Sequence, residues 1–191
     1  MTTPDDRPWA DLDADAKRDR ALRVAGELFA RDGLDVAMPV LADAIGVGVG
    51  SIYRQIGRKE DIVAALVVQR INRVVDLMSA ADGAADAWPA LCRVTFEIVT
   101  ESLSDRVVHE AWSVSSEHPL VLDARPRAAA ALDALVERAR EQGALRDDAG
   151  ADDLRLAFRA VQDVEDLGPG GARRLAELVL RGMAADGVAA P

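Results

Sequence analysis

Apolar residues recur every three to four positions along most of the chain, which is the spacing of one face of an α-helix. Near the N-terminus Leu22, Ala25, Leu28 and Phe29 follow this spacing, and Gly33 comes next, where a helix would end. No stretch of useful length alternates with the period of two that is typical of strands. The pattern therefore predicts an all-α protein with about nine helices.

The predicted helices differ in length, and glycine or proline separates them. Pro39 suits the first turn of a short helix that ends at Gly46, and a second short helix is expected over roughly 49–55. A long helix then opens near Lys59 and keeps one apolar stripe as far as Met78. The remaining expected helices cover 87–103, about 104–115, 121–142, 152–164 and 171–185.

Composition narrows the class of protein. Half of the residues are hydrophobic but only 4% are aromatic, so the core must consist mainly of Ala, Leu and Val, which suit packed helices. No apolar run reaches the roughly 18 residues of a membrane span. The acidic N-terminus lacks the apolar segment of a signal peptide. A cytoplasmic protein without a membrane partner is expected.

Catalytic and metal-binding residues are not apparent. Cys92 is the single cysteine, which excludes an internal disulfide and a cysteine-based zinc site. The two histidines, His109 and His118, stand in no motif that would orient a nucleophile. The sequence therefore predicts no enzyme, no cofactor and no metal.

The stretch "GVGVGSIYRQIGRKE" (46–60) contrasts with the rest of the chain. The formal net charge is -10, yet residues 17–59 hold eight basic and five acidic side chains, a local charge of +3. A G-x-G-x-x-G nucleotide loop does not fit, because Ser51 or Tyr53 stands where the last glycine belongs. A helical corner without a partner and a DNA-binding helix-turn-helix both fit.

The second short helix has the make-up of a recognition helix. Ile52 and Ile56 would point inward, and small, polar or basic residues would be presented to the solvent, where they could meet phosphates and base edges. The residues presented in this way are Val49, Gly50, Ser51, Tyr53, Arg54 and Gln55.

The segment "ALRVAGELFARDGLDVAMPVLADAIGVGVGSIYRQIGRKEDIVAAL" (21–66) resembles the DNA-binding domain of the tetracycline-repressor (TetR) family. The matching positions keep the order and spacing of that family: Leu28-Phe29, Gly33, Leu41-Ala42, Gly46-Val47, Gly50, Ile52-Tyr53, Ile56 and Lys59-Glu60. Carried over position by position, the resemblance implies DNA contacts at Val49, Gly50, Ser51, Tyr53, Gln55 and Lys59.

Four departures from the family pattern affect this prediction. Ala37-Met38-Pro39 stands where a capping Ser or Thr is usual, and Gly48 replaces a frequent Ser cap of the recognition helix. Gln55 replaces a frequent His, and Arg58 replaces a frequent capping residue. With Arg58 the chain loses a helix-capping side chain at this position and gains a cation that can contact a phosphate. Arg58 is therefore added to the predicted DNA-binding residues.

The C-terminal half carries no motif of its own, so its role comes from the resemblance. The acidic residues 1–16 are expected to form a flexible arm, and the family implies a DNA-binding domain at 17–62 and an effector-binding and dimerisation domain at 63–191. A homodimer is expected through the last two helices, with plain intrachain core as the alternative. The expected interface residues are Leu154, Phe158, Val161, Leu175, Val179 and Met183.

An effector pocket is expected among the helices at roughly 60–81, 87–115 and 121–142. Its predicted lining residues, each of which also fits a plain core, are Met78, Trp88, Cys92, Phe96, His109 and Trp112. The function implied is a ligand-responsive repressor whose partners are a double-stranded DNA operator, a small-molecule effector and a second copy of the chain. The alternatives are a helical adaptor or enzyme-like protein that reuses the helix-turn-helix, and an activator without a small ligand.

Overall fold

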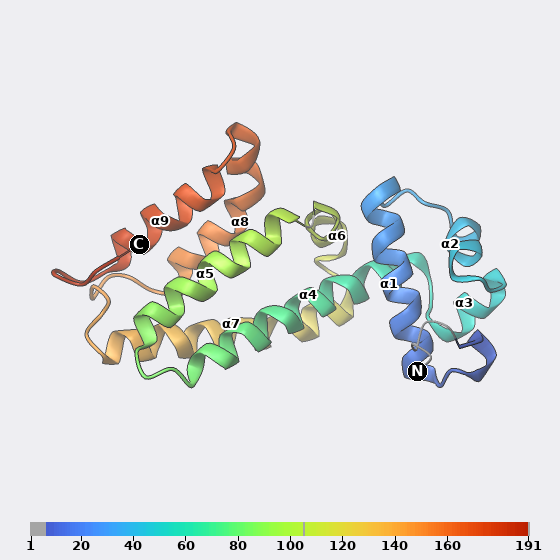
Figure 1. The fold of residues 1–191 in the computed structure, drawn as a ribbon, viewed down its shortest axis with the longest axis horizontal. Coiled ribbons are helices and arrows are strands. Elements are labelled where there is room, and N and C mark those ends of the chain that lie inside the picture. Colours follow the sequence, from blue (N-terminus) through green and yellow to red (C-terminus); the bar gives the residue numbers. More distant parts are fainter. Residues whose placement is uncertain (1–6, 105, 191) are drawn as a thin grey trace. The chain divides into compact units, whose positions relative to one another are not determined.

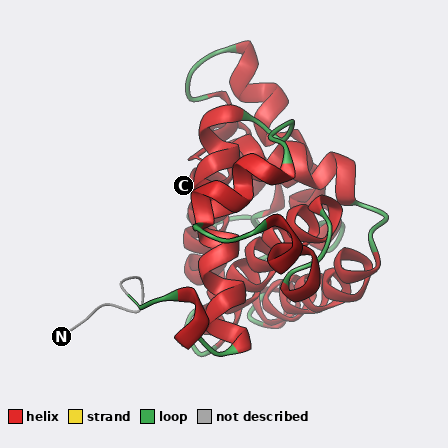
Figure 2. Cartoon of the chain, turned by 90° about the vertical axis from the view of Figure 1, so that its right-hand side faces the viewer, coloured by secondary structure: helices red, strands yellow, loops and turns green. Residues whose placement is uncertain are grey.

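The fold is built from helices, as the sequence predicts. The computed structural model describes residues 7–104 and 106–190, with the backbone alone at residues 104, 106–109 and 162. Within these ranges no strand forms, and one isolated bridge pairs Leu145 with Ala184. Figures 1 and 2 show the helices and their connecting loops. The elements are η2 (Trp9–Asp11), α1 (Ala14–Asp32), α2 (Met38–Ile45), α3 (Val49–Gln55), α4 (Lys59–Asp82), α5 (Ala87–Ser104), α6 (Arg106–Ser115), α7 (Pro119–Glu141), α8 (Ala151–Leu167) and α9 (Gly171–Met183).

The helices form two compact units that do not follow the chain in simple order. The first unit consists of Met1–Gln69 and Val107–Leu122, and the second consists of Arg70–Arg106 and Asp123–Pro191. Both α4 and α7 therefore begin in the first unit and end in the second. The functional division expected between residues 62 and 63 stays a prediction, and it does not coincide with these compact units.

Local sequence explains how the first unit begins. The carboxylate of Asp13 accepts a hydrogen bond from the Ala16 amide at 2.8 Å and so caps α1. Leu12, just before this cap, is buried. Helix η2 and the start of α1 lie within the predicted arm 1–16, and the flexibility of that arm stays a prediction. Residues 1–6 of that arm lie outside the described residues.

The core of the first unit follows the predicted stripe. The buried residues of α1, spaced three or four apart, include Leu22, Ala25, Leu28 and Phe29. Gly33 ends this helix with φ 82°, and its amide donates to the Phe29 carbonyl at 2.8 Å. Helices α1, α2 and α3 pack against one another in the three-helix arrangement that the sequence predicts.

The core of the second unit joins α5, α7, α8 and α9. Leu91, Leu135, Leu154 and Leu180, one from each of these helices, are completely buried. The two last helices pack along each other and against α5. The Glu165 carboxylate accepts hydrogen bonds from the amides of Gly170 and Ala172 at the turn between them. The closing helical pair is therefore fixed by a side chain as well as by apolar contacts.

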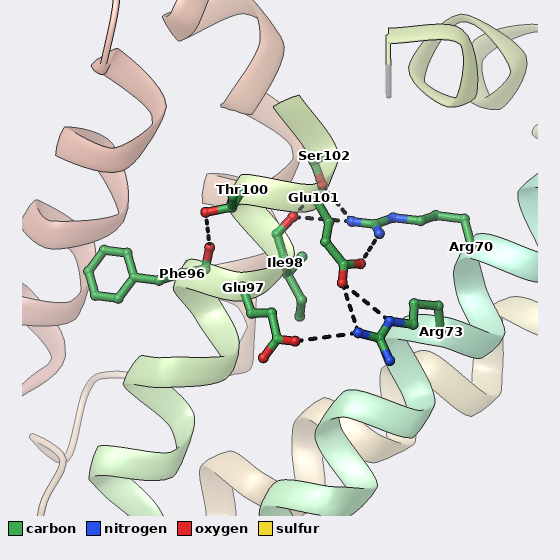
Figure 3. Close-up of polar contacts among 8 residues, drawn as sticks. All are labelled: Arg70, Arg73, Phe96, Glu97, Ile98, Thr100, Glu101 and Ser102. Carbon is green, nitrogen blue, oxygen red and sulfur yellow. Dashed lines mark hydrogen bonds and ion pairs between the residues drawn. The ribbon is translucent and has the colours of Figure 1, made fainter. Parts of the chain in front are cut away.

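A cluster of charged side chains joins α4 to α5 within the second unit (Figure 3). Arg70 forms an ion pair with Glu101 and donates to the Ser102 hydroxyl at 3.2 Å. Arg73 lies 3.0 Å from Glu101 and 3.4 Å from Glu97. Glu101 thus accepts from two guanidinium groups, and the pair it makes with Arg70 is largely buried. Charge pairing here supplements apolar packing between the two helices.

Candidate nucleic-acid interface

The first helix of the predicted helix-turn-helix is held by apolar side chains and by its C-terminal glycine. Leu41, Ala42 and Ile45 of α2 are buried. No side chain caps its start at Ala37, which agrees with the missing Ser or Thr noted in the sequence. Gly46 adopts a left-handed conformation with φ 83° and ψ 35°, and its amide donates to the Ala42 carbonyl at 2.9 Å. This glycine lets the chain turn directly into α3.

Helix α3 begins at Gly48 without a side-chain cap, and a backbone contact closes its first turn. The Ser51 amide donates to the Gly48 carbonyl at 2.8 Å. Ile52 is completely buried, and Ile56 at the end of the helix is 8% exposed. These two isoleucines point inward as predicted, so they attach the short helix to the unit by one side only.

The opposite side of α3 is open to solvent. The side chain of Tyr53 is 50% exposed, and Gly50, Arg54 and Gln55 are exposed as well. Val49 and Ser51 are half-buried at the start of the helix. All six residues expected on this helix are therefore accessible at least in part, and their assignment to DNA contact stays a prediction.

The two predicted basic contacts, Arg58 and Lys59, follow α3 directly. Arg58 is exposed and Lys59, the first residue of α4, is half-buried. Gly57 precedes them with φ 119°, a conformation that side-chain-bearing residues rarely adopt. All eight predicted DNA-binding residues thus lie in the continuous segment 49–59, which belongs to the first unit.

An acidic side chain missed by the sequence analysis fixes the turn after α3. Asp61 accepts a hydrogen bond from the Arg58 amide to its Oδ2 at 2.7 Å, and its Oδ1 lies 3.2 Å from His118 Nε2. The Arg58 amide, with the His118 ring, holds the pKa of the Asp61 carboxyl below its ordinary value, against the opposite effect of burial. An acid three residues after a helix start is half of a capping box, so this signal could have been found. His118 gives no local signal.

Four of the six residues predicted to line an effector pocket, Met78, Trp88, Cys92 and Phe96, belong to one apolar cluster of the second unit. Met78, Trp88 and Cys92 are buried in the core of the second unit, and the Trp88 indole donates to the Ala189 carbonyl at 2.9 Å. Burial raises the pKa of the Cys92 thiol to about 11, so it is neutral at physiological pH. These three residues pack in the apolar core, which was the alternative given for each, and their role as lining residues stays a prediction.

The other three predicted lining residues have different surroundings. Phe96 is half-buried, with the Arg173 guanidinium 5.0 Å from the centre of its ring. Trp112 is 37% exposed and belongs to the first unit, whereas Phe96 belongs to the second. The side chain of His109 lies outside the described residues. A pocket formed by Phe96, His109 and Trp112 stays a prediction.

The predicted dimer residues divide into two groups. Leu154, Val161 and Met183 are buried within the single chain. Their assignment to a dimer interface stays a prediction, because a regular stripe does not reveal whether it meets its own chain or another. Phe158, Leu175 and Val179 are half-buried, and for them the prediction stays open.

The same two helices expose other leucines. Leu156 is 69% exposed, Leu167 is 88% exposed and Leu178 is 51% exposed. Two open hollows, of about 490 and 470 Å³, lie along α8 and α9, and Leu175 lines both of them. An apolar surface of these helices is therefore available, and the first hollow includes three predicted positions, Leu175, Val179 and Met183.

Among groups of His, Cys, Asp and Glu within the described ranges, none is arranged to hold a metal ion. None of the described helices is long and apolar enough to cross a membrane.

Comparison with known proteins agrees with the geometry of the first unit. Residues 21–66 match a family model described as bacterial regulatory proteins of the tetR family. A TetR transcription regulatory protein from Mycobacterium vanbaalenii is 25% identical in sequence and superposes with a TM-score of 0.64. The alignment covers 90% of this chain and 97% of that protein. The TetR family transcriptional regulator PfmR from Thermus thermophilus is also 25% identical, with a TM-score of 0.66. That alignment covers 85% of this chain and 97% of PfmR.

A more distant structure shows the same fold. SmeT, the repressor of the Stenotrophomonas maltophilia multidrug efflux pump SmeDEF, is 17% identical, covers 94% of this chain and 96% of its own, and has a TM-score of 0.70. No curated protein matches the chain.

The fold and the family match over residues 21–66 support a DNA-binding regulator with an N-terminal helix-turn-helix. Residues 21–66 match the tetR-family model and the fold is that of solved tetR-family regulators, which confirms the resemblance seen in the sequence. The proteins from Mycobacterium vanbaalenii and Thermus thermophilus are described as transcription regulators, which also confirms the expectation of a regulator and not an enzyme.

Proposed function

We propose that the protein is a homodimeric repressor that binds a near-palindromic operator and is released from it by a small-molecule effector. The observation that supports operator binding is the two-sided character of α3. Ile52 is completely buried on one side, and Tyr53, Arg54 and Gln55 are exposed on the other. A helix held in this way can enter a major groove without losing its own packing.

Each predicted contact has a chemical role in this proposal. Gln55 reads a base edge through its amide, which can donate and accept at once. Tyr53 and Ser51 donate hydrogen bonds to phosphate oxygens, and Arg58 and Lys59 neutralise phosphates beside the helix. The excess of acidic residues elsewhere in the chain keeps non-specific affinity low, so that binding depends on this one segment.

The effector acts on a two-state dimer. A ligand that binds better to the dimer with widely spaced recognition helices weakens operator binding by its difference in affinity for the two states. The second unit is the proposed site of this control. The target of the protein is DNA, which places its action in the cytoplasm.

Fluorescence anisotropy tests the DNA-binding part of the proposal. The labelled duplex carries the DNA next to the protein's own gene, with unlabelled competitor DNA of scrambled sequence. Binding that survives excess competitor supports an operator. Binding that the competitor removes in proportion to its concentration contradicts it, and favours an adaptor that merely reuses the helix-turn-helix.

A further inference from the structure

Asp61 joins the turn after α3 to a segment that is distant in sequence. Its Oδ2 accepts the Arg58 amide at 2.7 Å, and its Oδ1 lies 3.2 Å from Nε2 of His118, which is 57 residues further along the chain. A β-carbon added to Gly57 would lie 2.6 Å from Oδ2, so the turn and this carboxylate fit closely. One side chain thus contacts both the end of the predicted DNA-binding segment and the corner between α6 and α7.

His118 is held at its own end by the start of α7. Its Nδ1 accepts a hydrogen bond from the Leu120 amide at 3.3 Å, and its carbonyl accepts one from the Val121 amide at 2.9 Å. The imidazole side chain is only 19% exposed. Because Nδ1 acts as an acceptor, the neutral ring carries its hydrogen on Nε2 and donates it to Asp61. The ring therefore caps α7 with one nitrogen and holds Asp61 with the other.

The corner that carries His118 belongs to the same compact unit as the helix-turn-helix. Residues 107–122 belong to the first unit, although the stretches before and after them belong to the second. Within this corner Ala111 and Val121 are completely buried. The contact from His118 to Asp61 consequently lies inside one compact unit, and it attaches the turn at Gly57, Arg58 and Lys59 to a buried framework.

We propose that Asp61 and His118 are positioning residues for DNA binding, which hold the turn after α3 so that the DNA-binding segment keeps the orientation an operator requires. Neither residue needs to touch DNA for this role. The inference rests on the proposed DNA-binding function, and it names the contact by which the α6–α7 corner acts on that function.

Two substitutions of His118 separate its two roles. In His118→Asn the short amide oxygen can still cap α7 through the Leu120 amide, but the side chain no longer reaches Asp61. In His118→Gln the longer amide can still donate to Asp61, but glutamine is a poor cap. A positioning role therefore predicts that His118→Asn is impaired and His118→Gln is not, whereas a purely structural cap predicts the reverse.

The first measurement is hydrogen exchange of the full-length protein without DNA. We expect faster exchange across residues 49–62 in His118→Asn, including the Arg58 amide that Asp61 accepts, and wild-type exchange there in His118→Gln. Unchanged exchange in His118→Asn would overturn the proposal, whether or not the protein binds DNA. The two proposals can therefore fail separately. The proposed function would fail if the wild-type protein showed no selective DNA binding, which is a different result from unchanged exchange in His118→Asn.

The second measurement is affinity for the operator duplex as a function of salt. We expect His118→Asn to bind about fivefold more weakly, as for the loss of one hydrogen bond, with an unchanged salt slope because no cation is removed. In a double-mutant cycle, Asp61→Asn should add little to His118→Asn, since both remove the same contact. Wild-type affinity in His118→Asn, or fully additive losses in the double variant, would contradict the proposal. If His118→Asn does not fold, Asp61→Asn alone must show the weaker binding.

Discussion

The backbone of Gly171 approaches that of Val164 so closely that a β-carbon on Gly171 would lie 2.4 Å from the Val164 carbonyl oxygen. This contact joins the start of α9 to the end of α8, where the chain reverses through Gly168, Pro169 and Gly170. The obstacle is backbone, which cannot rotate out of the way as a side chain could. The packing of the last two helices thus depends on the absence of a side chain at this position.

Gly171→Ala should therefore lower the free energy of unfolding by about 1–3 kcal/mol, the usual cost of forcing an extra carbon into a packed contact. Urea unfolding measures this change. Gly182→Ala is the matched control, because it lies in the same helix with no atom near its added β-carbon. That control should be neutral or stabilising by up to about 1 kcal/mol. Equal stability of both variants would argue against the close contact.

Lys59→Ala should weaken binding to all DNA sequences alike and reduce the salt slope by about one unit, because one phosphate contact is lost. The measurement is affinity for operator and scrambled duplexes at several salt concentrations. Arg93→Ala provides the control, since Arg93 is exposed on α5 of the second unit. A slope that changes equally in both variants would remove Lys59 from the predicted contacts.

Tyr53→Phe removes a single hydroxyl and should cost about 1–3 kcal/mol of operator binding if that hydroxyl donates to a charged phosphate. The phenol is half exposed, so the free energy of unfolding should stay close to that of the wild type. Anisotropy titrations paired with urea unfolding distinguish the two quantities. Undiminished operator binding would place the hydroxyl outside the interface.

Acidic pH should weaken the fold through Glu101 and Asp61. Burial alone would raise the pKa of Glu101, but hydrogen bonds from Arg73 and Arg70 outweigh it and hold the pKa below its ordinary value. The pKa of Asp61 is lowered as well. A carboxyl with a lowered folded-state pKa stabilises the fold above its unfolded-state pKa, and this contribution is lost as the pH falls through the folded-state value. The loss should begin below about pH 5.

Glu101→Gln tests the contribution of the first of these carboxyl groups. At neutral pH we expect a loss of about 1–3 kcal/mol in the free energy of unfolding, because Arg70 is largely buried and loses its charged partner. Between pH 7 and pH 4 the variant should lose less stability than the wild type. Urea unfolding at both pH values supplies the comparison. An identical pH dependence would show that Glu101 does not contribute to it.

Leu178→Asp should shift a dimer to a monomer if the exposed face of α9 meets a second copy. A charge at a half-exposed leucine costs little in the isolated chain, but it is unfavourable in an apolar interface. Sedimentation velocity measures the association. Leu122→Asp offers a comparably exposed leucine on the first unit as a control. Loss of association in the control alone would move the interface away from α9.

Sequence reasoning succeeded where structure depends on local pattern. Helix α3 was expected over roughly 49–55 and spans Val49–Gln55, because a glycine precedes it and Ile52 anchors it. The solvent-exposed side of the same helix could also be predicted, since a short amphipathic helix has only one apolar face. These features are set by residues three or four positions apart.

Contacts between distant residues could not be predicted in this way. The bond from His118 to Asp61 depends on how α6 and α7 fold back, and no local signal gives that path. The apolar stripe of α8 correctly predicted a helix, but it could not show which surface covers that stripe. Leu154 and Val161 were assigned to a dimer interface, and in the structure of the single chain they are buried. Periodicity defines a face, and only the three-dimensional fold shows what covers it.

The placement of residues 107–122 in the first unit has a consequence for protein engineering. A fragment truncated after Gln69 would lack the α6–α7 corner, and with it the buried Ala111 and Val121 and the ring of His118. A chimeric regulator in which only the N-terminal helices were exchanged would have the same defect, because Asp61 would lie against an α6–α7 corner that comes from another protein. The DNA-binding unit of this protein is therefore discontinuous in sequence. A transplanted unit must include residues 107–122 as well as the N-terminal segment.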